Sequence, residues 1–325
     1  MLNDNIAELE AQLAANEIAC PHCHAVYLRD GLEPLTTVTC QSCGKPFLVG
    51  MMVGRYYLQE LAARSKFYST YLALANQDGD AFPVEVKLIA TASQTHPSQI
   101  KALWNEAQVG GLLNDTDFVS GCLDHGVSNG YYYIVRPYVE GERLDQHIAR
   151  CGKLPVEHAI KLALHLLAAL QHIYRTGFLY RNLQPANVLI NPFGYAVLYD
   201  LGQCRPVNEA KAPETSPQSE TPVSFHAPER LLHQGETLAS ELYSLGMVLY
   251  YALTGHPYFS DEEFADLLAR RFAGTRPSSG RFTELPASLA ILLDTMLRFN
   301  SAERPQECAD VVDSLKAILM ELEED

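Results

Sequence analysis

The chain has 325 residues, which is enough for about two domains whose cores need no disulfide staples. Its formal net charge of −15 argues against broad binding to nucleic-acid phosphates or anionic membranes, because both reward clustered Lys and Arg. The first residues lack the basic and apolar regions of a signal peptide, and no segment approaches the ~18 apolar residues of a membrane span. Eight cysteines without a secretory signal indicate a reducing cytoplasm, where paired cysteines usually bind metal.

Residues 1–18 are predicted to contain an amphipathic helix. Its apolar stripe recurs at spacings of four, three and four and consists of Leu2, Ile6, Leu9 and Leu13. We expect the stripe to pack on the neighbouring domain. A dimeric coiled coil is the alternative, but two heptads are too few to favour it.

Residues 19–50 are predicted to form a zinc ribbon. Two C-x-x-C pairs, separated by sixteen residues, supply four thiols from Cys20, Cys23, Cys40 and Cys43. The Asp30-Gly31 turn is expected to fold the intervening chain into a hairpin that brings the two pairs together. Four thiolates leave no open coordination position, so we expect one structural zinc ion that supplies the ribbon's folding free energy. His22 and His24 are alternative ligands.

The stretch from Tyr180 to Gly202 reads Y-R-N-L-Q-P-A-N-V-L-I-N-P-F-G-Y-A-V-L-Y-D-L-G. It resembles the catalytic loop, hairpin and metal-binding turn of protein kinases, whose loop reads H-R-D-L-K-P-x-N. In that family the Asp accepts the substrate's hydroxyl proton and the Lys steadies the transferring phosphate. Asn182 and Gln184 stand at these two positions here, whereas the family's magnesium-binding positions are retained as Asn187 and Asp200.

Alternating strands at residues 56–61, 68–75 and 84–89 resemble the start of a kinase small lobe, which we assign to residues 53–138. The resemblance implies that Lys87 holds the nucleotide phosphates and that Glu106, in a helix predicted over residues 98–113, is its acidic partner. The family's glycine-rich loop would fall between residues 61 and 71, which contain no glycine. Without glycine, the backbone N–H groups cannot approach phosphates closely, so a phosphate cradle of this type is not expected.

The resemblance also places two charged residues at the adenine pocket. Glu85 stands where V-A-I-K has its Ala, and Arg136 stands at the apolar gatekeeper position. Either charge alone in an apolar slot would be costly. We therefore expect Glu85 and Arg136 to form an ion pair that fills part of the nucleotide site. The alternative is that one or both side chains turn out to solvent.

Residues 139–325 resemble the kinase large lobe. Ala227-Pro228-Glu229 matches the family's A-P-E sequence, Arg304 matches the ion-pair partner of that Glu, and Glu241 opens the segment that resembles the central helix. The whole resemblance covers about residues 53–320 and implies an α+β, bilobal fold with a β-rich small lobe and a helical large lobe, preceded by the helix and the ribbon.

Arg181 matches the family's arginine that grips a phosphate on the activation segment. A polar, Pro-rich stretch without periodicity occupies the place of that segment, and its hydroxyl groups are candidate phosphorylation sites: Thr215, Ser216, Ser219, Thr221 and Ser224. Phosphorylation could order the stretch against Arg181. The alternative is that these are solvated linker residues.

We expect a catalytically impaired kinase-like protein, a pseudokinase, that acts as a protein-interaction scaffold or allosteric regulator. In that case Lys87 and Glu106 only lock a helix, and Asn187 and Asp200 only organise the loop. The alternative is a weak or atypical Ser/Thr kinase, or a phosphoryl or nucleotidyl transferase, that uses Mg-ATP. Unidentified proteins are the expected partners, and a ribbon-led nucleic-acid binder or a membrane partner is disfavoured by the charge.

Overall fold

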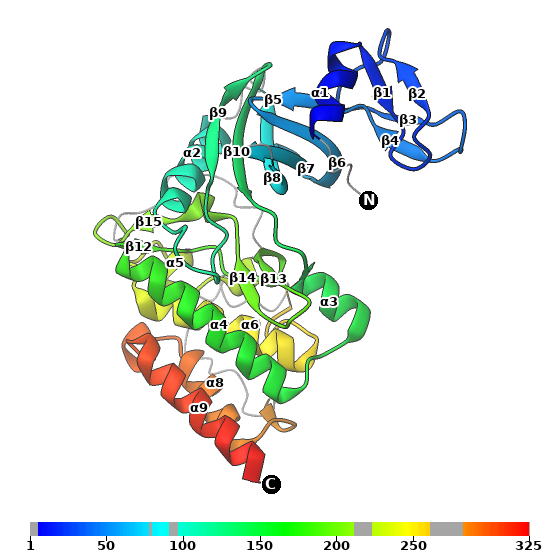
Figure 1. Cartoon of the computed structure of the whole chain (residues 1–325). Helices are drawn as coiled ribbons and strands as arrows, with labels where there is room; N and C mark the ends of the chain where they lie inside the picture. The colour runs from blue at the N-terminus through cyan, green and yellow to red at the C-terminus, as the bar shows by residue number, and fades with distance from the viewer. Residues whose placement is uncertain (1–5, 78–79, 91–96, 211–222, 261–281, 325) are drawn as a thin grey trace. The chain divides into compact units, whose positions relative to one another are not determined.

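The computed structural model of the chain describes residues 6–77, 80–90, 97–210, 223–260 and 282–324. The chain divides into two compact units. The first contains residues 1–111 and 121–138, and the second contains residues 112–120 and 139–325. Sheets dominate the first unit and helices the second, so the fold class is the α+β class expected from the sequence (Figure 1).

A six-stranded antiparallel sheet forms the centre of the first unit. Its strands lie in the order β5 (Met51–Val53), β6 (Tyr56–Arg64), β7 (Ser69–Gln77), β8 (Asp80–Ala90), β10 (Tyr131–Pro137) and β9 (Asp124–Ser128). Because side chains alternate along a strand, β8 presents Val84, Val86 and Leu88 to one face and Glu85 and Lys87 to the other. The helix α2 (Pro97–Gly111) packs Leu103 and Ala107 against the sheet.

The ribbon consists of two short hairpins. Strand β1 (Glu17–Ala19) pairs with β2 (Val26–Leu28), and β3 (Thr37–Thr39) pairs with β4 (Pro46–Leu48). Each C-x-x-C pair therefore lies in the turn of its own hairpin. The expectation of a hairpin about Asp30-Gly31 was wrong, because β2 and β3 do not pair with each other in the described part of the chain.

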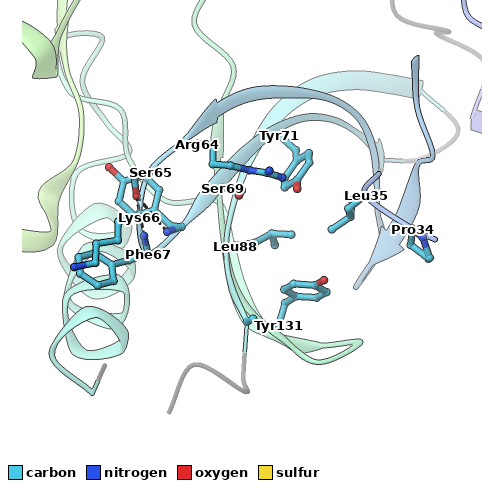
Figure 2. Close-up of a pocket in the computed structure, with 12 residues that line it drawn as sticks. Pro34, Leu35, Arg64, Ser65, Lys66, Phe67, Ser69, Tyr71, Leu88 and Tyr131 are labelled. Atoms are coloured by element: carbon cyan, nitrogen blue, oxygen red, sulfur yellow. Dashed lines mark hydrogen bonds between the residues drawn. The ribbon is translucent and has the colours of Figure 1, made fainter. Parts of the chain in front are cut away.

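The ribbon is joined to the sheet by direct pairing. The connection after residue 48 forms strand β5, which pairs with β6. Leu35 of the ribbon packs on the sheet face opposite to α2, although its backbone is left-handed with φ of 61°. Leu35, Leu88 and Tyr131 are among the residues that line a pocket of about 310 Å³, and Figure 2 shows these three side chains near one another. The Arg29 guanidinium also donates to the carbonyl of Gly50 over 2.9 Å.

The N-terminal helix α1 (Ile6–Ala14) lies against the same unit. Leu9 is buried with Tyr57 and Leu74 of the sheet, and Leu13 packs beside them. This contact is the packing on a neighbouring domain that the apolar stripe predicts. Leu2 lies outside the described residues, and the side chain of Ile6 is not described.

The second unit is built around α4 (Val156–Arg175), which packs against α6 (Leu238–Thr254) and α9 (Cys308–Glu324). Its described part also contains the α-helices α3 (Leu144–Cys151), α5 (Pro228–Leu231) and α8 (Ala287–Met296). Short strands complete it: β11 (Glu142–Arg143), β13 (Val188–Ile190) and β14 (Ala196–Leu198) form one sheet, while β12 (Phe178–Leu179) pairs with β15 (Arg205–Pro206). No described helix combines the length and apolarity that crossing a membrane requires.

Residues 112–120 belong to the second unit, although the sequence places them inside the small lobe. The reason is backbone pairing with β14. The N–H of Ser120 donates to the carbonyl of Leu198 over 2.7 Å, and the N–H of Leu198 donates to the carbonyl of Phe118 over 2.9 Å. The Phe118 ring also stacks on His165 of α4, with ring centroids 5.4 Å apart.

Candidate functional sites in the two units

The two cysteine pairs lie in turns with matching backbone geometry. The N–H of Cys20 donates to the carbonyl of Ala25, and the N–H of Cys40 donates to the carbonyl of Lys45, each over 2.9 Å. In each turn the residue after the second cysteine has left-handed backbone, as the φ angles of 59° at His24 and 72° at Gly44 show. Such tight turns direct two neighbouring thiols to one point.

The four sulfur atoms lie within 4.8 Å of one another. Cys20 Sγ is 3.8 Å from Cys43 Sγ, and Cys23 Sγ is 3.5 Å from Cys40 Sγ. Four sulfurs bound tetrahedrally at ~2.3 Å to one zinc ion would be about 3.8 Å apart. The observed separations fit this arrangement and exceed the ~2.05 Å of a disulfide bond. The cluster could therefore hold one metal ion.

Neither His22 nor His24 belongs to the cysteine cluster. His22 and His24 are not members of the group of ligand atoms, and His22 Nε2 lies 3.3 Å from the carbonyl oxygen of Pro46. Tyr27 Oη lies 3.1 Å from Cys40 Sγ. A phenol that donates to a thiolate stabilises its charge and orients it, as outer-shell partners of metal ligands do.

A chain of four charged side chains crosses the first unit on the face of the sheet that carries α2. Lys87 Nζ lies 2.7 Å from Glu106 Oε2, and the other carboxylate oxygen of Glu106 lies 3.1 Å from Arg136. Arg136 Nε in turn lies 2.8 Å from Glu85 Oε2. The ion pair between Glu85 and Arg136 that the sequence suggested is therefore present, and β10 brings it about by placing Arg136 opposite Glu85 on β8.

Burial makes this chain of charges tightly coupled. Side-chain exposure is 8% for Lys87, 5% for Glu106, 9% for Arg136 and 21% for Glu85. Charges so far from water interact strongly, and each needs its partner to offset the lost hydration. Glu106 therefore holds two cations, whereas the family resemblance implied Lys87 alone.

The turn between β6 and β7 stands where the resemblance places the glycine-rich loop. The N–H groups of Phe67 and Tyr68 each lie 3.2 Å from Ser65 Oγ, and the N–H of Ser65 donates to the carbonyl of Tyr68 over 2.9 Å. These N–H groups bond within the turn and do not form an open phosphate cradle. The Tyr68 ring also covers the ammonium of Lys87, with 4.3 Å between Nζ and the ring centroid.

The catalytic-loop positions of the second unit form a local hydrogen-bond network. The Asn182 amide donates to the Asp200 carboxylate over 3.0 Å, and the Gln184 amide lies 3.4 Å from Asn182 Oδ1. The Asn187 amide nitrogen donates to the Asn182 carbonyl over 2.8 Å. Because the amide nitrogen is used in that bond, the amide oxygen of Asn187 is the atom that could bind a magnesium ion.

The chemistry of this loop is limited by its residue types. An amide such as that of Asn182 or Gln184 can donate and accept hydrogen bonds, but it cannot take up a proton at neutral pH. A carboxylate at position 182 would repel Asp200, whereas Asn182 binds it. Asp200 itself has left-handed backbone, with φ of 64°. The loop is therefore ordered without the charges that proton transfer uses.

Two further sequence-predicted residues form a buried ion pair. Arg304 contacts both carboxylate oxygens of Glu229 at 2.8 Å, and the two side chains are 0% and 6% exposed. The Arg304 guanidinium also lies over the Tyr243 ring, 4.7 Å from its centroid. The expected pairing of the A-P-E glutamate with this arginine is thus present.

Arg181 and Glu241 also meet. The N–H of Arg181 donates to Glu241 Oε1 over 2.8 Å. Burial raises the pKa of Glu241 to about 7, and the hydrogen bond from Arg181 opposes that rise. The Arg181 guanidinium binds Glu236, with its NH2 group 2.6 Å from Glu236 Oε1. Sequence reasoning missed Glu236, and an acidic residue in an otherwise uncharged stretch before α6 is the one signal that could have identified it.

Of the candidate phosphorylation sites, Ser224 is described and the others are not. Ser224 is buried, with 5% of its surface exposed, so a modifying enzyme cannot reach it in this state. Thr215, Ser216, Ser219 and Thr221 lie outside the described residues.

Comparison with known proteins assigns the fold to a family. A model of the protein kinase domain matches residues 66–315. The chain is 29% identical over 270 residues to serine/threonine-protein kinase PknA of Mycobacterium tuberculosis, covering 82% of this chain and 61% of that protein. It is 26% identical over 262 residues to PknH of Mycobacterium bovis, covering 80% and 42%, and 29% identical over 238 residues to PknK of Mycobacterium tuberculosis, covering 72% and 21%. The chain thus spans less than two thirds of each relative's length, and it belongs to the protein kinase domain family.

Proposed function

We propose that this chain is a catalytically impaired member of the kinase family that acts as a protein-interaction scaffold or allosteric regulator. The observation that carries the proposal is the hydrogen bond from the Asn182 amide to the Asp200 carboxylate. The position that the resemblance gives to the proton acceptor holds a neutral donor, and that donor is bound to the residue expected to hold magnesium.

The energetic consequence is large. Loss of a positioned general base costs roughly 10² to 10⁴ in rate, which is about 3–5 kcal/mol of barrier at ~1.36 kcal/mol per decade. Gln184 brings no charge to steady a phosphate. We therefore do not propose that this loop supports ordinary protein-kinase turnover.

The first unit supports the same proposal. The Lys87 ammonium is held by Glu106 and covered by Tyr68. On the family resemblance, Glu85 and Arg136 stand at the adenine pocket, so a nucleotide bound there would have to break a partly buried ion pair. Loss of one partner from such a pair typically costs about 3–5 kcal/mol.

A second candidate function is a weak or atypical Ser/Thr kinase, or a phosphoryl or nucleotidyl transferase, that uses Mg-ATP. The 2.7 Å pair between Lys87 and Glu106 favours it, because it keeps the lysine's family partner. Asn187 and Asp200 retain the amide and carboxylate oxygens that suit magnesium. This candidate would need a base other than Asn182.

Titration with ATP, with and without Mg²⁺, separates the two candidates. Thermal stability and direct binding are measured for the intact protein, for Lys87→Ala and for Asn182→Asp/Gln184→Lys, which restores both family residues. The scaffold proposal expects no shift, whereas a ligand at 100 times its dissociation constant would stabilise the fold by about 2.7 kcal/mol. Mg²⁺-dependent nucleotide turnover by the intact protein that Lys87→Ala abolishes would overturn the scaffold proposal and establish the enzyme.

The proposal includes one structural zinc ion on the four cysteines, with the ribbon and α1 as additional docking surface for protein partners. Four thiolate donors at the observed spacing suit zinc and leave no open position for a substrate. A reducing compartment such as the cytoplasm keeps such cysteines reduced, so that they remain able to bind metal. The net charge of −15 supports protein partners over nucleic acid or membrane.

A further inference from the structure

A buried cluster of charges surrounds Arg181 in the second unit. The Arg181 Nε lies 3.0 Å and 3.1 Å from the two carboxylate oxygens of Glu236, and its NH2 group lies 2.6 Å from one of them. The two side chains are 3% and 6% exposed. Two parallel contacts between a guanidinium and a carboxylate give the strongest and most directional pairing available to Arg. The carboxylate of Glu236 therefore already occupies the side of the Arg181 guanidinium to which an anion would bind.

Glu236 also connects the catalytic loop to Ala210. Its backbone N–H donates to the carbonyl of Ala210 over 3.3 Å, and Ala210 is 1% exposed. Ala210 is the last described residue before the polar stretch 211–222. One residue thus contacts Arg181 through its side chain and Ala210 through its backbone.

Further charged groups lie around this pair. Arg230 donates to the backbone carbonyl of Arg181 and, over 3.1 Å, to Gln203. Glu241 accepts from the backbone N–H of Arg181. A phosphorylated residue would add a charge of about −1.5 to −2. Placing that charge beside the buried Glu236 carboxylate is unfavourable unless this carboxylate leaves.

We propose that Glu236 is a built-in substitute for a phosphorylated residue: its carboxylate occupies the Arg181 guanidinium, and its backbone N–H binds the Ala210 carbonyl, without phosphorylation. Phosphates on Thr215, Ser216, Ser219 or Thr221 then do not dock on Arg181, contrary to what the family resemblance implied. The inference does not depend on whether the chain transfers phosphoryl groups, because Glu236 contacts neither Asn182 nor Asp200 in the described hydrogen bonds.

The test replaces Glu236 by Ala in the full chain and supplies inorganic phosphate as the probe. Tm is measured in phosphate and in chloride at equal ionic strength, and Glu209→Gln, an exposed acidic change nearby, is the control. Phosphate stabilises many proteins non-specifically, so the informative quantity is its effect on Glu236→Ala minus its effect on the control. We expect Glu236→Ala to lose roughly 5 °C or more, since it leaves a buried Arg unpaired. We expect phosphate to recover at least half of that loss and to shift the intact protein no more than the control.

Three results would overturn the inference. They are a phosphate-specific Tm increase in the intact protein, a Glu236→Ala variant as stable as the intact protein, and a loss of Tm that phosphate does not recover. If Glu236→Ala does not fold, the double variant Arg181→Met/Glu236→Leu tests the pairing, since it should have a higher Tm than Arg181→Met alone. A second, independent test replaces Thr215, Ser216, Ser219 and Thr221 by Asp. The inference expects an unchanged Tm, and an increase of several degrees that Arg181→Met abolishes would contradict it.

Discussion

Arg136 Nε lies 2.8 Å from Glu85 Oε2, on adjacent strands where Arg136 and Glu85 are direct cross-strand partners. The guanidinium also reaches Glu106, so one arginine neutralises two carboxylates while Lys87 neutralises the far side of Glu106. The four charges in this series therefore depend on one another, so removing Glu85 should alter the interactions of Lys87 at the other end.

The first prediction concerns Arg136. Arg136→Met should destabilise the fold by about 3–5 kcal/mol, because it leaves two largely buried carboxylates with one lysine. The double variant Arg136→Met/Glu85→Ala should recover much of that loss, because Lys87 and Glu106 remain paired. Urea denaturation measures both, and Arg64→Met, at an exposed arginine of the same sheet, is the control. A double variant less stable than Arg136→Met would show that Glu85 contributes through other contacts.

The second prediction concerns the cysteine cluster. We expect one zinc ion per chain, and its removal by a chelator should unfold the ribbon, since structural zinc supplies roughly 10–16 kcal/mol of binding free energy to small ribbons. Elemental analysis and thiol titration measure the metal and the released cysteines. Cys40→Ser should bind less metal, whereas Cys151→Ser, at an exposed cysteine outside the cluster, should bind as the intact protein does. An intact ribbon without metal would refute the structural role.

The third prediction concerns the pair between Glu229 and Arg304. Glu229→Gln should cost about 3–5 kcal/mol, because a fully buried guanidinium loses its counter-charge. Glu303→Gln is the matched control: its pair with Arg298 is 3.8 Å long and the two side chains are 51% and 40% exposed. Exposed pairs contribute only about 0–1 kcal/mol. Equal losses in the two variants, measured by urea denaturation, would contradict the argument from burial.

The fourth prediction concerns pH. His226 is buried, and its Nε2 has no hydrogen-bond partner among the described residues. Burial, with help from the charges of Arg230 and Arg181, lowers the pKa of His226 to about 3. Its folded-state pKa lies below the unfolded value of about 6.5, so its contribution is complete above pH 6.5 and declines as the pH falls toward 3.

The measurement for His226 is the urea midpoint between pH 7 and pH 5, before most carboxylates titrate. As the pH falls, His226 contributes a loss of stability with a limiting slope of about 1.36 kcal/mol per pH unit, whereas Glu241, with its raised pKa of about 7, contributes a gain. The informative quantity is therefore a difference between proteins: His226→Gln should remove the loss that His226 contributes, whereas His158→Gln, at an exposed histidine, should leave the slope of the intact protein unchanged. Equal slopes in all three proteins would show that His226 takes up its proton in the folded state.

Residues that act with sequence neighbours or with motif partners were predictable. Period-two alternation identifies the strand that carries Lys87, the kinase resemblance places Arg136, and the spacing of the C-x-x-C pairs predicts the cysteine cluster. The pairing of Glu85 with Arg136 could be suggested because each charge alone would be costly in an apolar slot.

Contacts that depend on how distant segments fold together were not predictable. Tyr68 covers Lys87 because Ser65 closes the preceding turn, and no sequence pattern shows which way that ring lies. Arg181 and Glu236 are 55 residues apart in the chain. Strand β5 falls at the boundary between the predicted ribbon and the predicted small lobe, and its three residues are too few to show alternation.

Strand β5, which directly follows the ribbon in the chain, forms one edge of the six-stranded sheet. The kinase domain match begins at residue 66, so β5 and β6 both lie outside it. Strand β5 pairs with residues 56–58 of β6, whose other edge pairs with β7. A chain that lost the ribbon and β5 would expose unpaired N–H and C=O groups at this part of β6, and such edges recruit strands from other molecules. We therefore expect that unfolding the ribbon together with β5 would favour self-association through β6.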